Sequence, residues 1–216
     1  MRPYFFPKWT NTVRPIFTAL LAGGLVYVVV LAVFLLSGGT TNTGYQPVQP
    51  VPYSHALHAG ELGIDCRYCH NTVESAGFAA LPPTQTCMNC HVQIRSQSPN
   101  LLPVRQSFAT GEPIPWIRVH DLPDYAYFNH SAHVSRGVPC VSCHGRVDKM
   151  DVVHQDQPLT MGWCLDCHRN PERHVRPVEF VTRMDWQPEE DQLTLGRRLC
   201  ETNNIRPPTD CSTCHR

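Results

Sequence analysis

The 216-residue sequence predicts one membrane helix near the N-terminus, followed by a domain of short helices and long loops with almost no sheet. Three observations lead to this fold class. A run of 20 residues near the N-terminus carries no charge, 17 of the 20 prolines follow residue 44, and one motif with two cysteines occurs five times. The length fits one domain plus an anchor. The formal net charge of zero argues against a nucleic-acid partner, which requires a basic patch.

The uncharged run covers residues 17–36, FTALLAGGLVYVVVLAVFLL. A helix of this length is about 30 Å long, which matches the hydrocarbon core of a bilayer. A cleaved signal peptide is the alternative, but its apolar region is only about 7–15 residues long and ends at a small-residue cleavage site. We therefore expect an uncleaved anchor over residues 17–37 that crosses the cell (inner) membrane once.

The basic residues before this run predict the topology. Arg2, Lys8 and Arg14 precede it, and the next basic residue is Arg67. The positive-inside rule then places residues 1–16 in the cytoplasm and the chain after residue 37 in the periplasm. Residues 38–54, rich in Gly, Thr, Pro and Gln, predict a linker to a periplasmic domain over residues 55–216. After residue 44 the chain carries 15 basic and 18 acidic residues, a mildly acidic balance of −3.

The repeated motif is C-x-x-C-H, which is typical of covalent c-type haem attachment. The two thiols bond to the haem, and the adjacent histidine reaches the iron as its proximal ligand. Zinc knuckles do not require a histidine after each cysteine pair, and redox dithiols occur singly in a βαβ pattern that is absent here. The predicted attachment residues are Cys66, Cys69, Cys87, Cys90, Cys140, Cys143, Cys164, Cys167, Cys211 and Cys214, and the proximal ligands are His70, His91, His144, His168 and His215. Cys200 is left over and is expected to be a free thiol.

Residues 53–70 resemble residues 128–144, since both read aromatic-x-His-x-x-His, a short loop and then C-x-x-C-H. A second motif follows each copy, which predicts two dihaem modules over residues 55–91 and 130–168 and a fifth haem at 211–215. Histidines three positions apart lie on nearly one face of a helical turn. We therefore expect distal iron ligands at His55, His58, His130 and His133.

Five haems need a fifth distal ligand, or one iron stays open. Met150 is the first candidate because it follows His144 by six residues, and a thioether raises the potential of a haem relative to bis-histidine ligation. His174 follows His168 by six residues and is the second candidate. Lower candidates are Met161, His120 and His154.

A chain so rich in proline and loops buries too little apolar surface to fold unaided. Five covalently bound c-type haems supply the core in its place, and the little protein around them keeps them close together. Close haems exchange electrons, so the domain is expected to act as an electron relay. The fifth haem, at the tip of the chain, is expected at one end of that relay.

Three segments of the domain resemble the pentahaem cytochrome c subunits (ActA) of alternative complex III. These segments are residues 49–94, 113–134 and 159–177, and the resemblance covers most of residues 47–180 and the single anchor. It implies an electron-transfer subunit that is not an enzyme by itself. Electrons would pass from an iron-sulfur subunit, through the five haems, to a periplasmic acceptor in respiration or photosynthesis.

The resemblance also implies the partners. Within the complex they are the iron-sulfur subunit, polytopic quinol-binding membrane subunits and a monohaem cytochrome. The acceptor is a soluble periplasmic carrier or a terminal oxidase. Two other functions remain open: a membrane-anchored multihaem quinol dehydrogenase that feeds a periplasmic reductase, and a pentahaem enzyme such as a nitrite reductase, which needs an open iron.

Overall fold

A computed structural model describes residues 7, 9–37 and 40–215, and the chain forms two compact units, Met1–Asn42 and Thr43–Arg216. The first unit contains one helix, α1, over Thr10–Leu35. It begins seven residues before the uncharged run and includes Arg14 and Pro15. A charged side chain ends an apolar run but does not end a helix, which is why the helix is longer than the run. Arg2 and Lys8, on which the predicted topology depends, lie outside the described residues.

Helix α1 is long and apolar enough to cross a membrane by its length and composition. Its 26 residues include a window with a mean hydropathy of 2.6, and none of its side chains is buried against the rest of the chain. An exposed apolar surface of this extent calls for lipid or for apolar partners. The helix therefore suggests membrane anchoring.

The second unit is built of short helices joined by long loops, and no β-strand occurs in residues 40–215. This confirms the helical, sheet-free fold. The α-helices are α2 (Cys66–Cys69), α3 (Thr84–His91), α4 (Leu102–Thr110), α5 (His130–Val134), α6 (Cys140–His144), α7 (Met161–Arg169), α8 (Gln192–Thr202) and α9 (Cys211–Cys214). Single turns of other helical types are η2 (Ala56–Glu61), η3 (Pro99–Leu101), η4 (Val147–Lys149), η5 (Pro171–Arg173) and η6 (Val178–Phe180).

The apolar core of this unit is small for its length. The buried apolar side chains among the described residues are Val51, Val104, Val134, Pro139, Met150, Val175, Val181 and Leu195. A domain of this length normally buries most of its large apolar side chains. We therefore expect bulky prosthetic groups, rather than side chains, to supply most of the buried apolar surface.

The segment before the first module lies along the second unit. Gly44 donates from its backbone N–H to the carbonyl of Gln155 at 2.7 Å, and the Gln46 side-chain amide donates to the carbonyl of Val152 at 2.8 Å. Val51 is buried. The compact unit thus begins at Thr43, earlier than the predicted domain start at residue 55.

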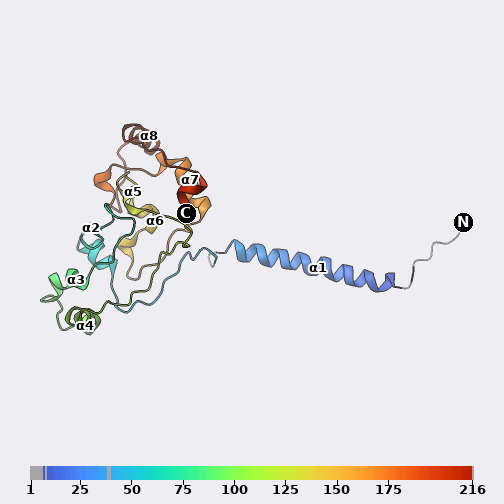
Figure 1. Ribbon diagram of the computed structural model, residues 1–216, viewed down its shortest axis with the longest axis horizontal. Coiled ribbons are helices and arrows are strands. Elements are labelled where there is room, and N and C mark those ends of the chain that lie inside the picture. The colour runs from blue at the N-terminus through green and yellow to red at the C-terminus, as the bar shows by residue number, and fades with distance from the viewer. Residues whose placement is uncertain (1–6, 8, 38–39, 216) are drawn as a thin grey trace. The chain divides into compact units, whose positions relative to one another are not determined.

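Within the second unit, the helices of the two modules occupy different regions. Helices α2 and α3 lie towards one side, α7 lies towards the other, and α5 and α6 lie between them (Figure 1). The C-terminal end of the chain lies near α7 in this view. Figure 1 thus separates the second C-x-x-C-H motif, on α3, from the fourth, on α7.

Candidate haem-binding sites

The five C-x-x-C-H motifs lie on or at the ends of five short helices, α2, α3, α6, α7 and α9. Polar caps start three of them: Asp65 accepts from the N–H of Arg67, Thr160 from that of Trp163 and Asp210 from that of Thr213. A helical turn brings residues i, i+3 and i+4 to one side. Each motif therefore directs both thiols and the histidine towards one region, and all 11 cysteines are free thiols, as covalent haem attachment requires.

Four of the five histidines predicted to be proximal ligands donate from Nδ1 to a backbone carbonyl. The acceptors are Ala80 for His70 at 3.0 Å, Ile94 for His91 at 2.9 Å, Pro208 for His168 at 2.7 Å and Tyr125 for His215 at 3.1 Å. A carbonyl only accepts, so Nδ1 carries the proton and Nε2 keeps its lone pair. Histidines that bind metals are oriented in this way.

His144 differs from the other four. Its Nδ1 lies 3.3 Å from Nε2 of His120, and the two ring centres are 4.4 Å apart. Burial, together with the neighbouring His120, lowers the pKa of His144 to about 3. Burial also lowers the pKa of His120, so both rings are neutral near pH 7. His120 therefore orients His144 in the way that a carbonyl orients each of the other four.

The two H-x-x-H segments face the motif histidines. Three pairs of ring centres are spaced alike: His58 and His91 at 6.2 Å, His130 and His144 at 6.4 Å, and His133 and His168 at 6.1 Å. Two imidazoles that bind one metal ion from opposite sides through bonds of about 2 Å have ring centres roughly 6 Å apart. The spacing therefore fits one haem iron held by each pair.

Three of the four H-x-x-H histidines are oriented by hydrogen bonds to backbone carbonyls. Nδ1 of His58 donates to the carbonyl of Ser54 at 2.8 Å, and Nδ1 of His133 donates to that of Asn129 at 2.7 Å. Nδ1 of His130 donates to the carbonyl of Gly77 at 3.2 Å. As in the proximal histidines, Nε2 is left as the ligating atom.

Aromatic rings before each H-x-x-H segment belong to the site, although the sequence reasoning assigned them no role. Tyr53 lies 4.5 Å from His58 and 4.8 Å from His55 between ring centres. Phe128 lies 4.5 Å from His133 and 4.8 Å from His130. The signal was present, since an aromatic residue stands at the same position in both copies of the repeat.

Two buried side-chain nitrogens among the described residues have no hydrogen-bond partner, Nδ1 of His55 and Nε2 of His174. Burial, together with the electrostatic effects of His70 and His58, lowers the pKa of His55 to about 4. A buried polar atom without a partner is costly and rare. The unpaired, buried Nε2 of His174 is the arrangement expected of a histidine that binds a metal.

The other candidates for the fifth distal ligand lie in different surroundings. Met150 is 9% exposed, and its carbonyl accepts from the N–H of Ala56 at 3.0 Å. Met161 is 67% exposed. His154 is close enough to His120 to lower its pKa, which places it on the side of the third motif. Of these candidates, only His174 presents an unpaired buried nitrogen.

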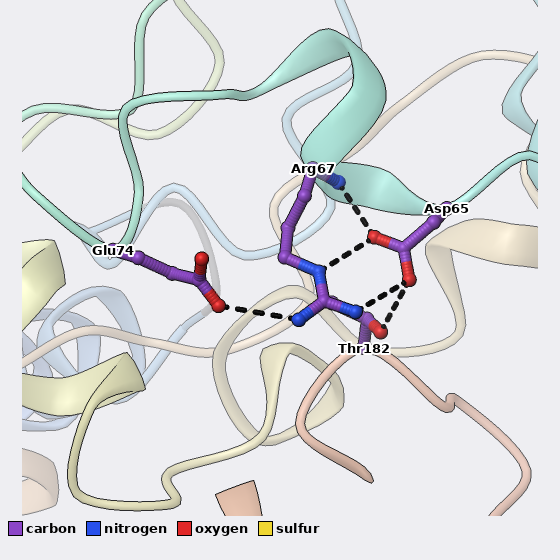
Figure 2. Close-up of polar contacts among 4 residues, drawn as sticks. All are labelled: Asp65, Arg67, Glu74 and Thr182. Carbon is purple, nitrogen blue, oxygen red and sulfur yellow. Dashed lines mark hydrogen bonds and ion pairs between the residues drawn. The ribbon is translucent and has the colours of Figure 1, made fainter. Parts of the chain in front are cut away.

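A polar network holds the first motif in place (Figure 2). Asp65 accepts from the backbone N–H, Nε and a terminal nitrogen of Arg67, and from Oγ1 of Thr182 at 2.9 Å. Arg67 also pairs with Glu74 at 3.2 Å. The hydrogen bond from the Arg67 side chain lowers the pKa of Asp65 to about 2. The network connects α2 to a loop 117 residues later in the chain.

Comparison with known proteins points to cytochromes c. Residues 126–216, which contain the third, fourth and fifth motifs, match the family described as cytochrome c7 and related cytochrome c. A relative from Nitratidesulfovibrio vulgaris (strain Hildenborough), named menaquinone reductase, multiheme cytochrome c subunit, is 29% identical over 60% of this chain and 71% of that protein. The motifs, the imidazole pairs and these similarities together relate the chain to the multihaem cytochromes c, which carry electrons on c-type haem.

Proposed function

We propose that this chain is the electron-relay subunit of a membrane complex that exchanges electrons between quinone and a carrier outside the membrane. The observation that carries the proposal is the set of imidazole pairs about 6 Å apart, each uniting a motif histidine with an H-x-x-H histidine. When bound, each haem supplies a one-electron carrier. Five such groups on one chain form a relay.

The role of each ligand follows from the pairs. His91, His144 and His168 hold three irons with His58, His130 and His133, respectively. His70 pairs with His55, because His55 occupies in the first module the position that His130 occupies in the second. Two histidines on an iron leave no site for a substrate, and the chain therefore transfers electrons without transforming a substrate.

The fifth iron is bound by His215 and one further residue. The orphaned buried nitrogen of His174 supports His174 in this role, and Met150 is the competing candidate. Ten cysteines in the five motifs hold the haems covalently. The proposal is therefore five haems, one for each motif.

The finer proposal concerns the complex. In the alternative complex III arrangement, an iron-sulfur subunit passes electrons from polytopic quinol-oxidising subunits to this chain, which reduces a periplasmic carrier, a monohaem cytochrome or a terminal oxidase. Helix α1 anchors the chain in the inner membrane, with its N-terminus in the cytoplasm and the haem domain in the periplasm. The resemblance of the loop segments supports this arrangement.

The relative from N. vulgaris supports a second candidate, in which electrons run the other way. Its name makes it the cytochrome subunit of a menaquinone reductase. In such a complex, a periplasmic donor would reduce this chain, and the membrane subunits would reduce menaquinone. The ligand pairs serve both directions equally, so the direction rests on the partners and on their potentials.

The test is a gentle detergent purification of the chain from its native membrane, with mass spectrometry of the proteins that come with it. Recovery of an iron-sulfur subunit and large polytopic subunits is the expected result. Reduction of the purified complex by a quinol then supports quinol oxidation, whereas quinone-dependent oxidation of a pre-reduced periplasmic donor supports quinone reduction. A chain recovered alone that oxidises quinol by itself would instead be a small quinol dehydrogenase.

An enzyme of the nitrite reductase class is distinguished by carbon monoxide. With six ligands on every iron, the reduced haem-loaded protein binds little carbon monoxide. Extensive carbon monoxide binding at one haem, with turnover of nitrite or hydroxylamine, would show that the chain is an enzyme and not an electron relay.

A further inference from the structure

The two dihaem modules hold each other reciprocally. In the second module, the first residues of α5 dock on the loop after the first motif: Ser131 donates from its N–H to the carbonyl of Ala76 at 3.2 Å. In the first module, Ala56 donates from its N–H to the carbonyl of Met150 at 3.0 Å. Ala76 follows His70 by six residues and Met150 follows His144 by six, so the two contacts are equivalent.

Reciprocal docking brings the first motif of each module against the first motif of the other. The Cys66 and Cys140 side chains, which occupy equivalent positions, lie close enough for each to shift the pKa of the other. One loop braces this joint. Thr182 donates to Asp65 just before α2 (Figure 2), and the carbonyl of the preceding residue, Val181, accepts from the N–H of Cys140 at 3.1 Å. The first and third motifs are therefore neighbours.

Within each module the two motifs are also neighbours. In the first, Nδ2 of Asn89, inside the second motif, donates to the hydroxyl of Tyr68, inside the first, at 3.0 Å. In the second, α5 faces both motifs, because His130 pairs with His144 and His133 pairs with His168. The second motif thus adjoins the first, and the fourth adjoins the third.

The fifth motif attaches to the fourth. Nδ1 of His168 donates to the carbonyl of Pro208, three residues before Cys211. The Cys214 carbonyl accepts from the N–H of Tyr127 at 2.7 Å, and this segment leads directly into α5. Cys164 and Cys214 are also close enough to interact electrostatically.

We infer that the five motifs follow one another in space in the order second, first, third, fourth, fifth, with the second and fifth at the two ends of the relay. The inference rests on the proposed function. Cys90 and Cys211, the two exposed cysteines of the 11, belong to these end motifs. One redox partner then exchanges electrons at α3 and another at α9. Each internal step moves one electron, so that one iron is oxidised and its neighbour is reduced, and no bond forms or breaks.

The test uses the full-length, haem-loaded chain with a ruthenium photosensitiser on one engineered thiol. Gln97→Cys places the label beside the second motif, and Asp124→Cys places it beside the fifth, both at exposed positions in a Cys200→Ser background. His58→Met marks the second-motif haem and His133→Met marks the fourth-motif haem, because thioether ligation raises the potential and makes that haem the final electron acceptor. Each variant is first checked for five haems by mass.

The inferred order predicts a crossover. The His58→Met haem is reduced faster from the label at 97 than from the label at 124, and the His133→Met haem is reduced faster from 124 than from 97. Equal rates from both labels, or the opposite preference, would overturn the order. A His58→Met protein that shows no thioether-ligated haem would instead contradict the ligand pairing of the proposed function.

A second measurement does not depend on these variants. In a density map of the haem-loaded chain, the second-motif and fifth-motif irons form the most widely separated pair. If another pair is further apart, the order is wrong, even where every iron has six ligands.

Discussion

At the residue scale, the histidines of this chain are distinguished by what their second nitrogen contacts. A ring whose Nδ1 donates to a carbonyl is oriented, and its Nε2 is free to bind a metal. This pattern recurs at both proximal and H-x-x-H positions, from His58 to His215. His174 presents an unpaired buried Nε2 and is our proposed fifth distal ligand, which the repeat could not reveal because His174 lies outside both copies.

Replacing His174 tests the fifth distal ligand. In the reduced His174→Ala protein we expect carbon monoxide to bind one haem per chain, since removal of a ligand opens one iron. The matched variant Met150→Leu keeps the volume of the buried side chain and is expected to bind no more than the wild type. Absorbance changes on carbon monoxide addition give the stoichiometry. If Met150→Leu opens an iron and His174→Ala does not, Met150 is the ligand.

Asp65 provides a pH-dependent contribution to stability. Its pKa in the folded chain is lowered to about 2 from 3.8, first by the Arg67 hydrogen bond, so the contribution is present above about pH 4 and is lost as the pH falls towards 2. Because the side chain is 43% exposed, we expect Asp65→Asn to cost only about 1 kcal/mol at pH 7. Urea unfolding of the haem-loaded protein at several pH values measures the difference.

The control for Asp65 is Asp121→Asn. Asp121 pairs with Arg118 at 2.7 Å, but both side chains are more than half exposed. Exposed pairs contribute little, so this variant is expected to match the wild type from pH 7 to pH 2. If the two variants lose stability equally, the contact of Asp65 with Thr182 does not brace the joint between the modules.

At the scale of elements, the sequence predicted the helices that carry chemistry and missed those that only pack. The motif helices follow from the need to gather two thiols and a histidine. Helix α8 has its own signals, with Asp191 as N-cap and a buried Leu195, but its Gly196 packs on the backbone of Glu172 in η5. That contact joins segments separated in sequence, and no local sequence pattern predicts it.

The pairing of ligands lay beyond the sequence for the same reason. The repeat predicted four H-x-x-H histidines as ligands. It did not show that the two histidines of one H-x-x-H segment face different motifs. Only the placement of α5 against α6 and α7 shows that His130 approaches His144 and that His133 approaches His168. The structure likewise places the aromatic rings of Tyr53 and Phe128 beside these histidines.

The packing of η2 on η4 is tested at Gly60. A Cβ there would collide with the carbonyl oxygen of Asp148, so Gly60→Ala forces the two turns apart. We expect a loss of about 1–3 kcal/mol in the free energy of unfolding. The matched variant is Gly77→Ala at the same joint, where a Cβ meets only ordinary contacts, 3.8 Å or more away. Denaturant unfolding measures both, and equal losses would contradict the proposed packing.

At the scale of the whole molecule, the second unit depends on its prosthetic groups. The apolar side chains buried in the described residues are few and are mostly valines. Loops that order without a large apolar core cannot offset their conformational entropy. We therefore expect the chain produced without haem attachment to be unfolded by circular dichroism, with the haem-loaded protein as the control. A helical, cooperatively melting haem-free domain would show that the protein core suffices.

The charge of the domain predicts its response to salt. The residues after position 44 carry a net charge of −3, to which bound haems add their propionates. An acidic surface steers a basic carrier, and salt screens that attraction. Electron transfer to a basic monohaem cytochrome c is thus expected to slow as ionic strength rises, as measured by stopped-flow absorbance. A neutral redox dye is the control, and equal salt dependence for both would exclude steering.

The reciprocal contacts between the modules have an evolutionary consequence. Each module offers a docking segment and receives one, and the Ser131–Ala76 and Ala56–Met150 contacts are counterparts in which the two modules exchange roles. An exchange of roles of this kind is typical of an isologous interface with two-fold symmetry, and the equivalent residues Cys66 and Cys140 lie near each other in the joint. The double module therefore has the form of an ancestral homodimer whose duplicated gene was fused into one chain, with the fifth motif added later at one end.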